Sequence, residues 1–205
     1  RQRQMCIRDR NGALRPGNSV DEITVDGSGA VDGTAATLKM MNGGKLEAEY
    51  SLYGLDGTKP VDRVVLVGAL GFEGTKSGVV EVKPYFSGDR TSGIGLLDLT
   101  ERRRAVVLST EVKGAGGFAG VLSSSPLVAV EMEHLDVTPY ERVLDGSGKT
   151  VTIRSEVALK LALRDEAGAK AALGLRDGNR ARMLEGMYAG IRGLSSGGGT
   201  NAASE

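Results

Sequence analysis

Residues 149–164 read Lys-Thr-Val-Thr-Ile-Arg-Ser-Glu-Val-Ala-Leu-Lys-Leu-Ala-Leu-Arg, and this stretch carries the strongest fold signal in the chain. Every odd position from Val151 to Leu163 is apolar except Ser155, whereas the even positions are polar, charged or alanine. A period of two puts alternate side chains on opposite faces of a β-strand. The stretch therefore predicts a strand of about fourteen residues, against about five or six for an ordinary strand. Its predicted apolar face consists of Val151, Ile153, Val157, Leu159, Leu161 and Leu163.

The sequence leaves two uses for this apolar face open. An extended sheet can present it to lipid acyl chains, whereas in an ordinary α+β domain it packs against a helix. A further alternative concerns the strand itself. Residues 156–163 consist of good helix formers, and a helix that starts near Ser155 would shorten the strand.

Short strand-like segments separated by turn signals fill most of the chain before this stretch. Asp-Gly occurs at five places and Asn-Gly at residues 42–43, and these dipeptides tolerate the positive φ of tight hairpin turns. Candidate strands lie at residues 22–26, 34–41, 45–53, 62–70, 78–86, 93–99, 104–113, 118–123 and 127–133. About ten strands at short spacing predict a mainly β (α+β) fold, in which an antiparallel meander forms a curved sheet or groove.

The composition changes after Arg164, where Ala, Leu, Arg, Glu and Met become frequent. We predict a β-rich domain over residues 11–164 and a C-terminal helical segment over residues 165–194. The helix is expected in two pieces, broken near Asp177 and Gly178. Residues 195–205 are rich in Ser and Gly and predict a flexible tail.

Residues 1–10 differ in character from the rest, and their second half, residues 5–10, resembles a translated sequencing-adapter read. We treat the segment as an artefact and leave it out of the fold prediction. Because it holds four arginines and one aspartate, its removal leaves 22 Lys and Arg against 25 Asp and Glu, a net charge of −3. The authentic N-terminus, with any signal or membrane anchor, is then expected outside this sequence.

The remaining composition argues against several classes of function. No basic stripe is left for nucleic acid, since the run Arg102, Arg103 and Arg104 is short and follows an acid. Without Cys6 the chain has no cysteine, which excludes thiol chemistry, cysteine-ligated zinc and disulfides. Gly accounts for 31 of 205 residues, about twice its typical usage, and Trp is absent. These features fit many turns around an aliphatic core.

Two glycine-rich motifs resemble nucleotide-binding loops but lack the helix that such loops need. Residues 143–150 end like a P-loop, yet Val143 stands where the pattern needs glycine and a strand-like segment follows. Residues 114–119 fit the loose pattern Gly-x-Gly-x-x-Ala, and no helix follows them either. We interpret the first as a hairpin turn and the second as a turn or bulge, so no cofactor is predicted.

His134 is the single histidine, so a Ser-His-Asp triad would have to use it and sites built on His pairs are excluded. The one Gly-x-Ser-x-Gly match, at residues 193–197, follows a helix instead of a strand. No Asp-x-Asp-x-Asp-Gly loop indicates calcium. We interpret His134 as a surface or strand-end residue beside Glu131 and Glu133. The sequence thus predicts no enzyme, with no catalytic, cofactor-binding or metal-binding residues.

Three fragments together resemble the AsmA-like group of Gram-negative envelope proteins, which combine repeated β-meanders with an apolar groove. Residues 41–48 resemble a recurrent Gly-Gly-Lys-Leu strand entry, and residues 92–100 a Gly-x-Gly-x-x-Asp-Leu hairpin. Residues 135–140 resemble a Leu-Asp-x-x-Pro-Tyr connector. The resemblance spans about residues 20–163 and departs from the pattern at Pro126 and the three serines before it.

The resemblance implies a non-enzymatic cell-envelope protein of the periplasm, active in lipid transport or outer-membrane maintenance. Its implied partners are phospholipid or other envelope proteins, and a membrane anchor would lie outside this fragment. The glycine-rich meander also fits an alternative, a phage or appendage structural subunit whose strands pair between copies.

Overall fold

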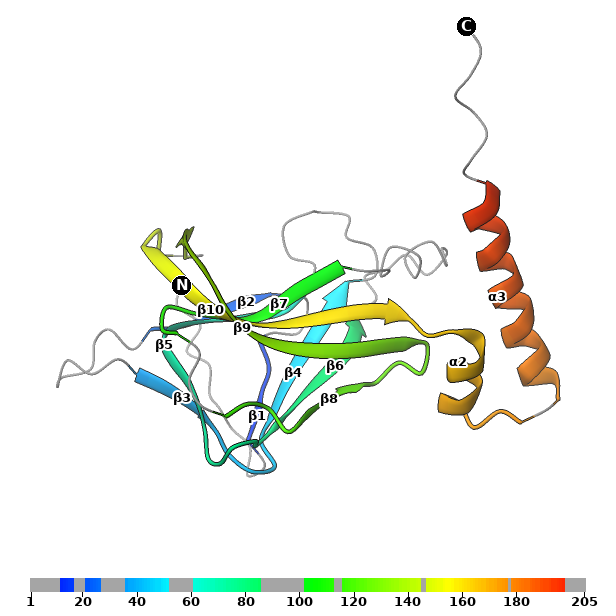
Figure 1. Ribbon diagram of the computed structural model, residues 1–205, viewed down its shortest axis with the longest axis horizontal. Coiled ribbons are helices and arrows are strands. Elements are labelled where there is room, and N and C mark those ends of the chain that lie inside the picture. Colours follow the sequence, from blue (N-terminus) through cyan, green and yellow to red (C-terminus); the bar gives the residue numbers. More distant parts are fainter. Residues whose placement is uncertain are drawn as a thin grey trace, which may run out of the picture.

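The computed structural model of the protein describes residues 12–16, 21–26, 36–51, 61–85, 102–112, 116–144, 147–176 and 178–197. This part of the chain holds ten strands and two helices. The strands form two β-sheets that pack face to face, and the helices stand beyond one end of the longest strands (Figure 1). The predicted mainly β fold with C-terminal helix is therefore confirmed.

The first sheet contains four strands, all parallel to their neighbours. In spatial order they are β1 (Ala13–Leu14), β4 (Lys45–Ser51), β6 (Val79–Tyr85) and β8 (Gly120–Ser123). Their register aligns Leu14, Leu46, Val80 and Val121 across the sheet. These aligned side chains point to the second sheet and belong to or pack against the main core. The alternate positions carry Lys45, Glu47, Glu81 and Lys83, whose ion pairs lie on the outer face.

The second sheet mixes parallel and antiparallel pairs. It contains β2 (Glu22–Asp26), β3 (Ala36–Met40), β5 (Arg63–Phe72), β7 (Arg102–Ser109), β10 (Thr150–Leu163) and β9 (Val128–Val143). Strand β5 is parallel to β7 and to both β2 and β3, which pair with its first and second halves. Strand β10 is antiparallel to β7 and to β9. It follows that β9 runs in the same direction as β7, and only β10 runs against the rest.

The predicted antiparallel meander is wrong, because most tight turns join strands of different sheets. The turn at Asn42 and Gly43, where Gly43 has φ +80°, connects β3 to β4. These strands do not pair with each other, since β3 pairs with β5 and β4 pairs with β1 and β6. Most steps along the chain thus change sheet, and in the first sheet each return adds a strand parallel to its neighbour, whereas β2 to β3 and β9 to β10 stay in the second sheet. A sequence signal for a tight turn does not say whether the flanking strands pair.

The main core fills the space between the sheets with aliphatic side chains. The first sheet contributes Leu46, Ala48, Tyr50, Val80 and Val82, and the second contributes Val64, Leu66, Val106, Val107, Val157, Leu159 and Leu161. Burial of one such aliphatic side chain stabilises a fold by about 1.5–3 kcal/mol, so this cluster supplies much of the driving force.

The C-terminal helices close one end of the long strands. Helix α2 (Glu166–Ala172) begins at Asp165, whose carboxylate accepts a hydrogen bond from the Gly168 N–H, and α3 (Asn179–Gly197) follows. The predicted break is confirmed by Gly178, which has φ +102° between the helices. Helix α3 continues to Gly197, three residues into the segment expected to be a tail. Residues 93–99, a predicted strand, lie outside the described residues.

Candidate functional site

The six residues of the predicted apolar face lie on one strand, β10, and five of them are buried. The exposed fraction is 7% for Val151, 0% for Ile153, 4% for Val157, 0% for Leu159 and 2% for Leu161, and Leu163 is half-buried. The strand prediction is confirmed over Thr150–Leu163, and the alternative helix from Ser155 is wrong. The protein's own chain covers this face.

The face is divided between three environments. Val157, Leu159 and Leu161 belong to the main core between the sheets. Val151 and Ile153 instead contact Val65 and Leu108, which form a second cluster with Leu144. Neighbouring residues of a strand point to opposite faces, so this second cluster lies on the outer face of the second sheet. Leu163 packs with the helix residues Ala169, Leu184 and Tyr188.

The start of β10 and the end of β9 therefore form a clasp, residues 136–144 and 147–153, over the outer face of the second sheet. Register shifts mark its base, between Ile153 and Ser155 on the β9 side and between Val157 and Ala158 on the β7 side. Such irregularities bend a strand and increase its twist, which brings its later side chains to a different face. The paired strands β9 and β10 also confirm the hairpin predicted near residues 143–150.

Ion pairs fix the clasp to the far edge of the sheet. Glu22 on β2 has a side chain only 2% exposed, and it pairs with both Arg142 of the clasp and Arg63 of β5. Lys149 Nζ lies 3.3 Å from Asp26 Oδ2, further along β2. The clasp consequently joins β2, the first strand of this sheet, to β9, its last strand.

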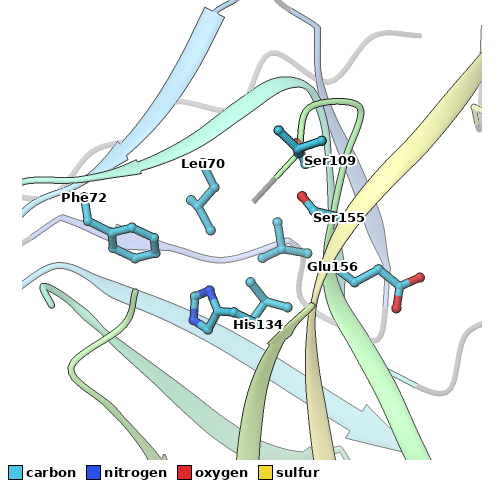
Figure 2. A pocket seen from close by; sticks show the side chains of 9 residues that line it. Leu70, Phe72, Ser109, His134, Ser155 and Glu156 are labelled. Atoms are coloured by element: carbon cyan, nitrogen blue, oxygen red, sulfur yellow. The ribbon is translucent and has the colours of Figure 1, made fainter. Parts of the chain in front are cut away.

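A small cavity of about 20 Å³ lies beneath β10, beside its change of environment. Figure 2 shows Phe72, Leu70 and His134 on one side of it and Ser109 and Ser155 on the other, while the Glu156 carboxylate points away. That volume is enough for about one water molecule. The cavity is too small for an organic substrate.

The serine and histidine side chains around this cavity have structural hydrogen bonds. Ser109 Oγ donates to the Gly68 carbonyl at 2.5 Å, and Ser155 Oγ donates to the Glu111 carbonyl at 2.7 Å. His134 Nε2 accepts from the Phe118 N–H at 3.5 Å. A nucleophilic serine would instead donate to the histidine. These hydrogen bonds connect separate segments of the chain around the cavity.

His134 has a role that sequence reasoning missed. Its ring lies 5.7 Å from both Phe72 and Phe118, which themselves meet edge to face at 5.2 Å. The side chain is half-buried on β9 and faces inward with Met132, so it is not a surface residue. The sequence did contain evidence for this role. His134 follows Val128, Val130 and Met132 at intervals of two residues, so on a strand it shares their face. Glu131 and Glu133 have the opposite parity and are exposed.

A larger groove of about 450 Å³ opens on the other side of His134, between β8 and β9. Its lining includes Val121 of β8, Met132 of β9 and Phe118. Thr75 and Lys76 line one end, beside the glycine-rich segment 116–120. Val121, Met132 and Phe118 also contact the main core, so the groove reaches the apolar interior.

A buried carboxyl group joins the two sheets at another corner. Asp62, which is 2% exposed, precedes β5 and accepts hydrogen bonds from the Asp21 N–H at 2.7 Å and the Glu49 N–H at 2.8 Å. Burial, with the carboxylates of Glu49 and Asp21 nearby, raises the pKa of Asp62 to about 7. The two backbone donors lower it but do not offset the burial. This group is a structural link whose charge changes near neutral pH.

The described residues hold no group of three or more His, Cys, Asp or Glu side chains that could bind a metal ion. Neither described helix is long and apolar enough to cross a membrane. Residues 193–197, the serine motif, lie in the last turns of α3, so they do not form the strand-turn-helix geometry of a nucleophile elbow. Of the loose dinucleotide motif, residues 116–119 are described, and they lead into strand β8 without a helix.

No protein-family model matches this sequence, and no curated protein matches it either.

Proposed function

We propose that this chain is a non-enzymatic structural module that joins a larger assembly through the open edges of its sheets. The observation that carries this proposal is the parallel, in-register first sheet, which within the described residues ends at β1 on one side and β8 on the other. An edge strand offers backbone hydrogen-bonding groups to a strand from another chain. Leu122, 54% exposed on β8, adds an apolar contact on the outer face of that edge.

The distribution of apolar side chains also favours an assembly role. The apolar side chains along β10 pack in the main core, in the clasp and against the helices, so other parts of the chain already cover them. The outer face of the first sheet instead carries paired charges, as a solvated surface does. Among the described residues, the edges of the first sheet and the groove between β8 and β9 are surfaces that a partner strand can reach.

Size-exclusion chromatography with light scattering tests the proposal on the purified full chain. We expect species larger than a monomer whose population rises with protein concentration. Replacing Leu122 with Pro should reduce them, because proline removes an N–H and disfavours strand pairing. Leu122→Ser is the matched control, because it shortens the same side chain but keeps the N–H, and it should reduce them less. A strictly monomeric chain at all concentrations contradicts the proposal.

Lipid binding in a bacterial envelope is the second function that we propose, and the groove is the observation that favours it. A lipid-transport role needs an apolar surface that acyl chains can reach. The β10 row is covered, whereas Phe118, Val121 and Met132 line an opening that is connected to the core. Native mass spectrometry of protein purified from a bacterial periplasm should then show bound phospholipid. Protein that is free of lipid in that experiment would remove this candidate.

A further inference from the structure

We propose that the groove between β8 and β9 binds the free C-terminus of an extended peptide, which adds to β8 as an antiparallel strand with its carboxylate next to Lys76. This inference deepens the assembly role, because it rests on the proposed function and names the partner's chemistry. The occupant to which we commit is a partner protein's C-terminal segment in which apolar side chains alternate with polar ones.

The edge of β8 is the first argument for a peptide. Within the described part of the chain, β8 pairs with β6 and with no other strand. Its other side borders the groove, whose lining includes Gly120 and Val121 of this strand. An added strand bonds to such an edge through its backbone, while alternate side chains enter pockets. A lipid tail has no backbone groups to offer there.

The floor of the groove is the second argument, because it fits one face of a strand. The inner face of β9 contributes Met132 and His134, and Phe118 lies between them and β8. These groups are largely apolar or aromatic, while the outward-facing Glu131 and Glu133 are exposed on the other face of β9. A volume of about 450 Å³ lies within the range of a small-ligand site. Side chains of every second residue of the peptide would fill it.

The charge at one end gives the direction of the peptide. Lys76 is an exposed cation in the groove lining, which contains no carboxylate. It lies in the turn before β6, and this turn is held to the segment before β8 by the Ser77 N–H, which donates to the Gly117 carbonyl at 3.0 Å. Lys76 is thus beside the start of β8. A peptide whose C-terminal carboxylate meets Lys76 must run antiparallel to β8.

The glycines near Lys76 allow the two turns at this end of the groove to pack closely against each other. Gly116 has φ +93°, and a Cβ there would lie 2.9 Å from the Gly74 carbonyl oxygen. The two turns therefore approach more closely than any other residue type allows. Gly120 is different, because a Cβ built on it meets nothing within 4 Å. This Cβ position shares the outer face of β8 with Leu122, so the start of the strand is open on that face.

Fluorescence anisotropy with a labelled eight-residue peptide of alternating valine and threonine tests the inference on the full chain. The free-acid peptide should bind, and its C-terminal amide should bind about tenfold more weakly because the charged contact is lost. Lys76→Glu should weaken the acid peptide by at least about tenfold and leave the amide nearly unchanged. Lys39→Glu, an exposed change on β3, is the matched control and should alter neither.

Hydrogen exchange locates the bound peptide. Amides of Gly120–Ser123 should gain protection with the free-acid peptide, and they should not with a peptide whose valines are N-methylated. Equal affinity for acid and amide, or protection elsewhere than β8 and β9, would overturn the inference. Oleate that binds in the groove more tightly than the peptide, without contacting β8, would also overturn the inference. A chain that does not self-associate contradicts the proposed function but can still bind the peptide, so the two failures are distinguishable.

Discussion

The two halves of β10 have the same alternating pattern and very different surroundings. Val157, Leu159 and Leu161 lie between the sheets, where side chains from both sheets surround them. Val151 and Ile153 lie in the clasp and cover the outer face of the second sheet. Disrupting the packing of the first group opens the core, whereas disrupting the packing of the second group exposes only the outer face of the second sheet. The comparison teaches that one sequence period can specify two packing layers when the strand bends between them.

The largest effect is expected at Leu159, which is 0% exposed in the core half. Leu159→Asp should abolish folding or lower the free energy of unfolding by about 4 kcal/mol or more, because it buries an unpaired carboxylate. Lys160→Asp, one residue away on the exposed face, should change it by about 0.5 kcal/mol at most. Urea denaturation followed by circular dichroism measures both. Similar losses for the two variants would contradict the assignment of faces.

The clasp half should respond more locally. Ile153→Ala should lower the free energy of unfolding by about 2–4 kcal/mol through the lost contact and the cavity left behind. Hydrogen exchange should also become faster in residues 141–144 and 147–151 before the core strands respond, because the clasp can open without separating the sheets. Thr152→Ala, on the exposed face, is the control. Uniformly faster exchange in β4 and β6 would show that clasp and core unfold as one unit.

The sequence predicted the buried side of β10 well but could not show which layer each residue joins. Alternation determines which side chains share a face, and Leu46, Tyr50, Val80 and Val82, at alternate positions of their strands, are all buried. The bend near Ile153 depends on long-range contacts with Val65 and Leu108, which no local pattern reveals. Ala158, on the polar face, is 1% exposed because the strands carrying Ala105 and Glu133 flank it.

The pairing of the strands could not be predicted from the sequence either. Parallel pairing joins residues about 32–43 positions apart, such as Ala13 with Lys45 and Val64 with Val107. Turn dipeptides report only the local change of direction, so they favoured hairpins where the chain in fact crosses between sheets. The groove was missed for the same reason. Met132 and Val121 come together only when β8 ends one sheet and β9 ends the other.

A change of pH should alter the stability of the junction between the sheets, at Asp62, but not that of the clasp. The folded state keeps the Asp62 proton up to about pH 7, whereas the unfolded chain releases it near the ordinary value of 3.8. The folded state thus binds more protons between these values, and its stability falls as the pH rises through that window. We expect about 2 kcal/mol of loss from this group between pH 5 and 8.

The matched variant for this effect is Asp62→Asn, which cannot titrate. It should be less stable at pH 5, because the amide has one acceptor oxygen for the two N–H groups of Asp21 and Glu49. Its stability should nevertheless depend less on pH than that of the natural chain. Thermal denaturation at pH 5, 6, 7 and 8 measures the two slopes. Parallel curves would show that Asp62 is ionised throughout the range.

The smallest effects are expected from the ion pairs that hold the clasp. Arg142→Met should lower the free energy of unfolding by about 1 kcal/mol, since Glu22 is almost completely buried and loses one of its two cations. Arg63 remains 3.3 Å from that carboxylate, so the charge is not left alone and the loss stays below that of a fully broken buried pair. Lys149→Met should cost about 0.5 kcal/mol or less, because both partners of its pair with Asp26 are well exposed.

Salt concentration then sharpens the comparison of these two variants. Screening weakens an exposed pair much more than a buried one, so the effect of Lys149→Met should vanish in 1 M NaCl while that of Arg142→Met persists. Urea titrations at low and high salt measure the difference. If both effects disappear at high salt, the Glu22 site is solvated and the clasp is held by Val151 and Ile153 alone. If both persist, Lys149 contributes through the packing of its aliphatic stem instead of its charge.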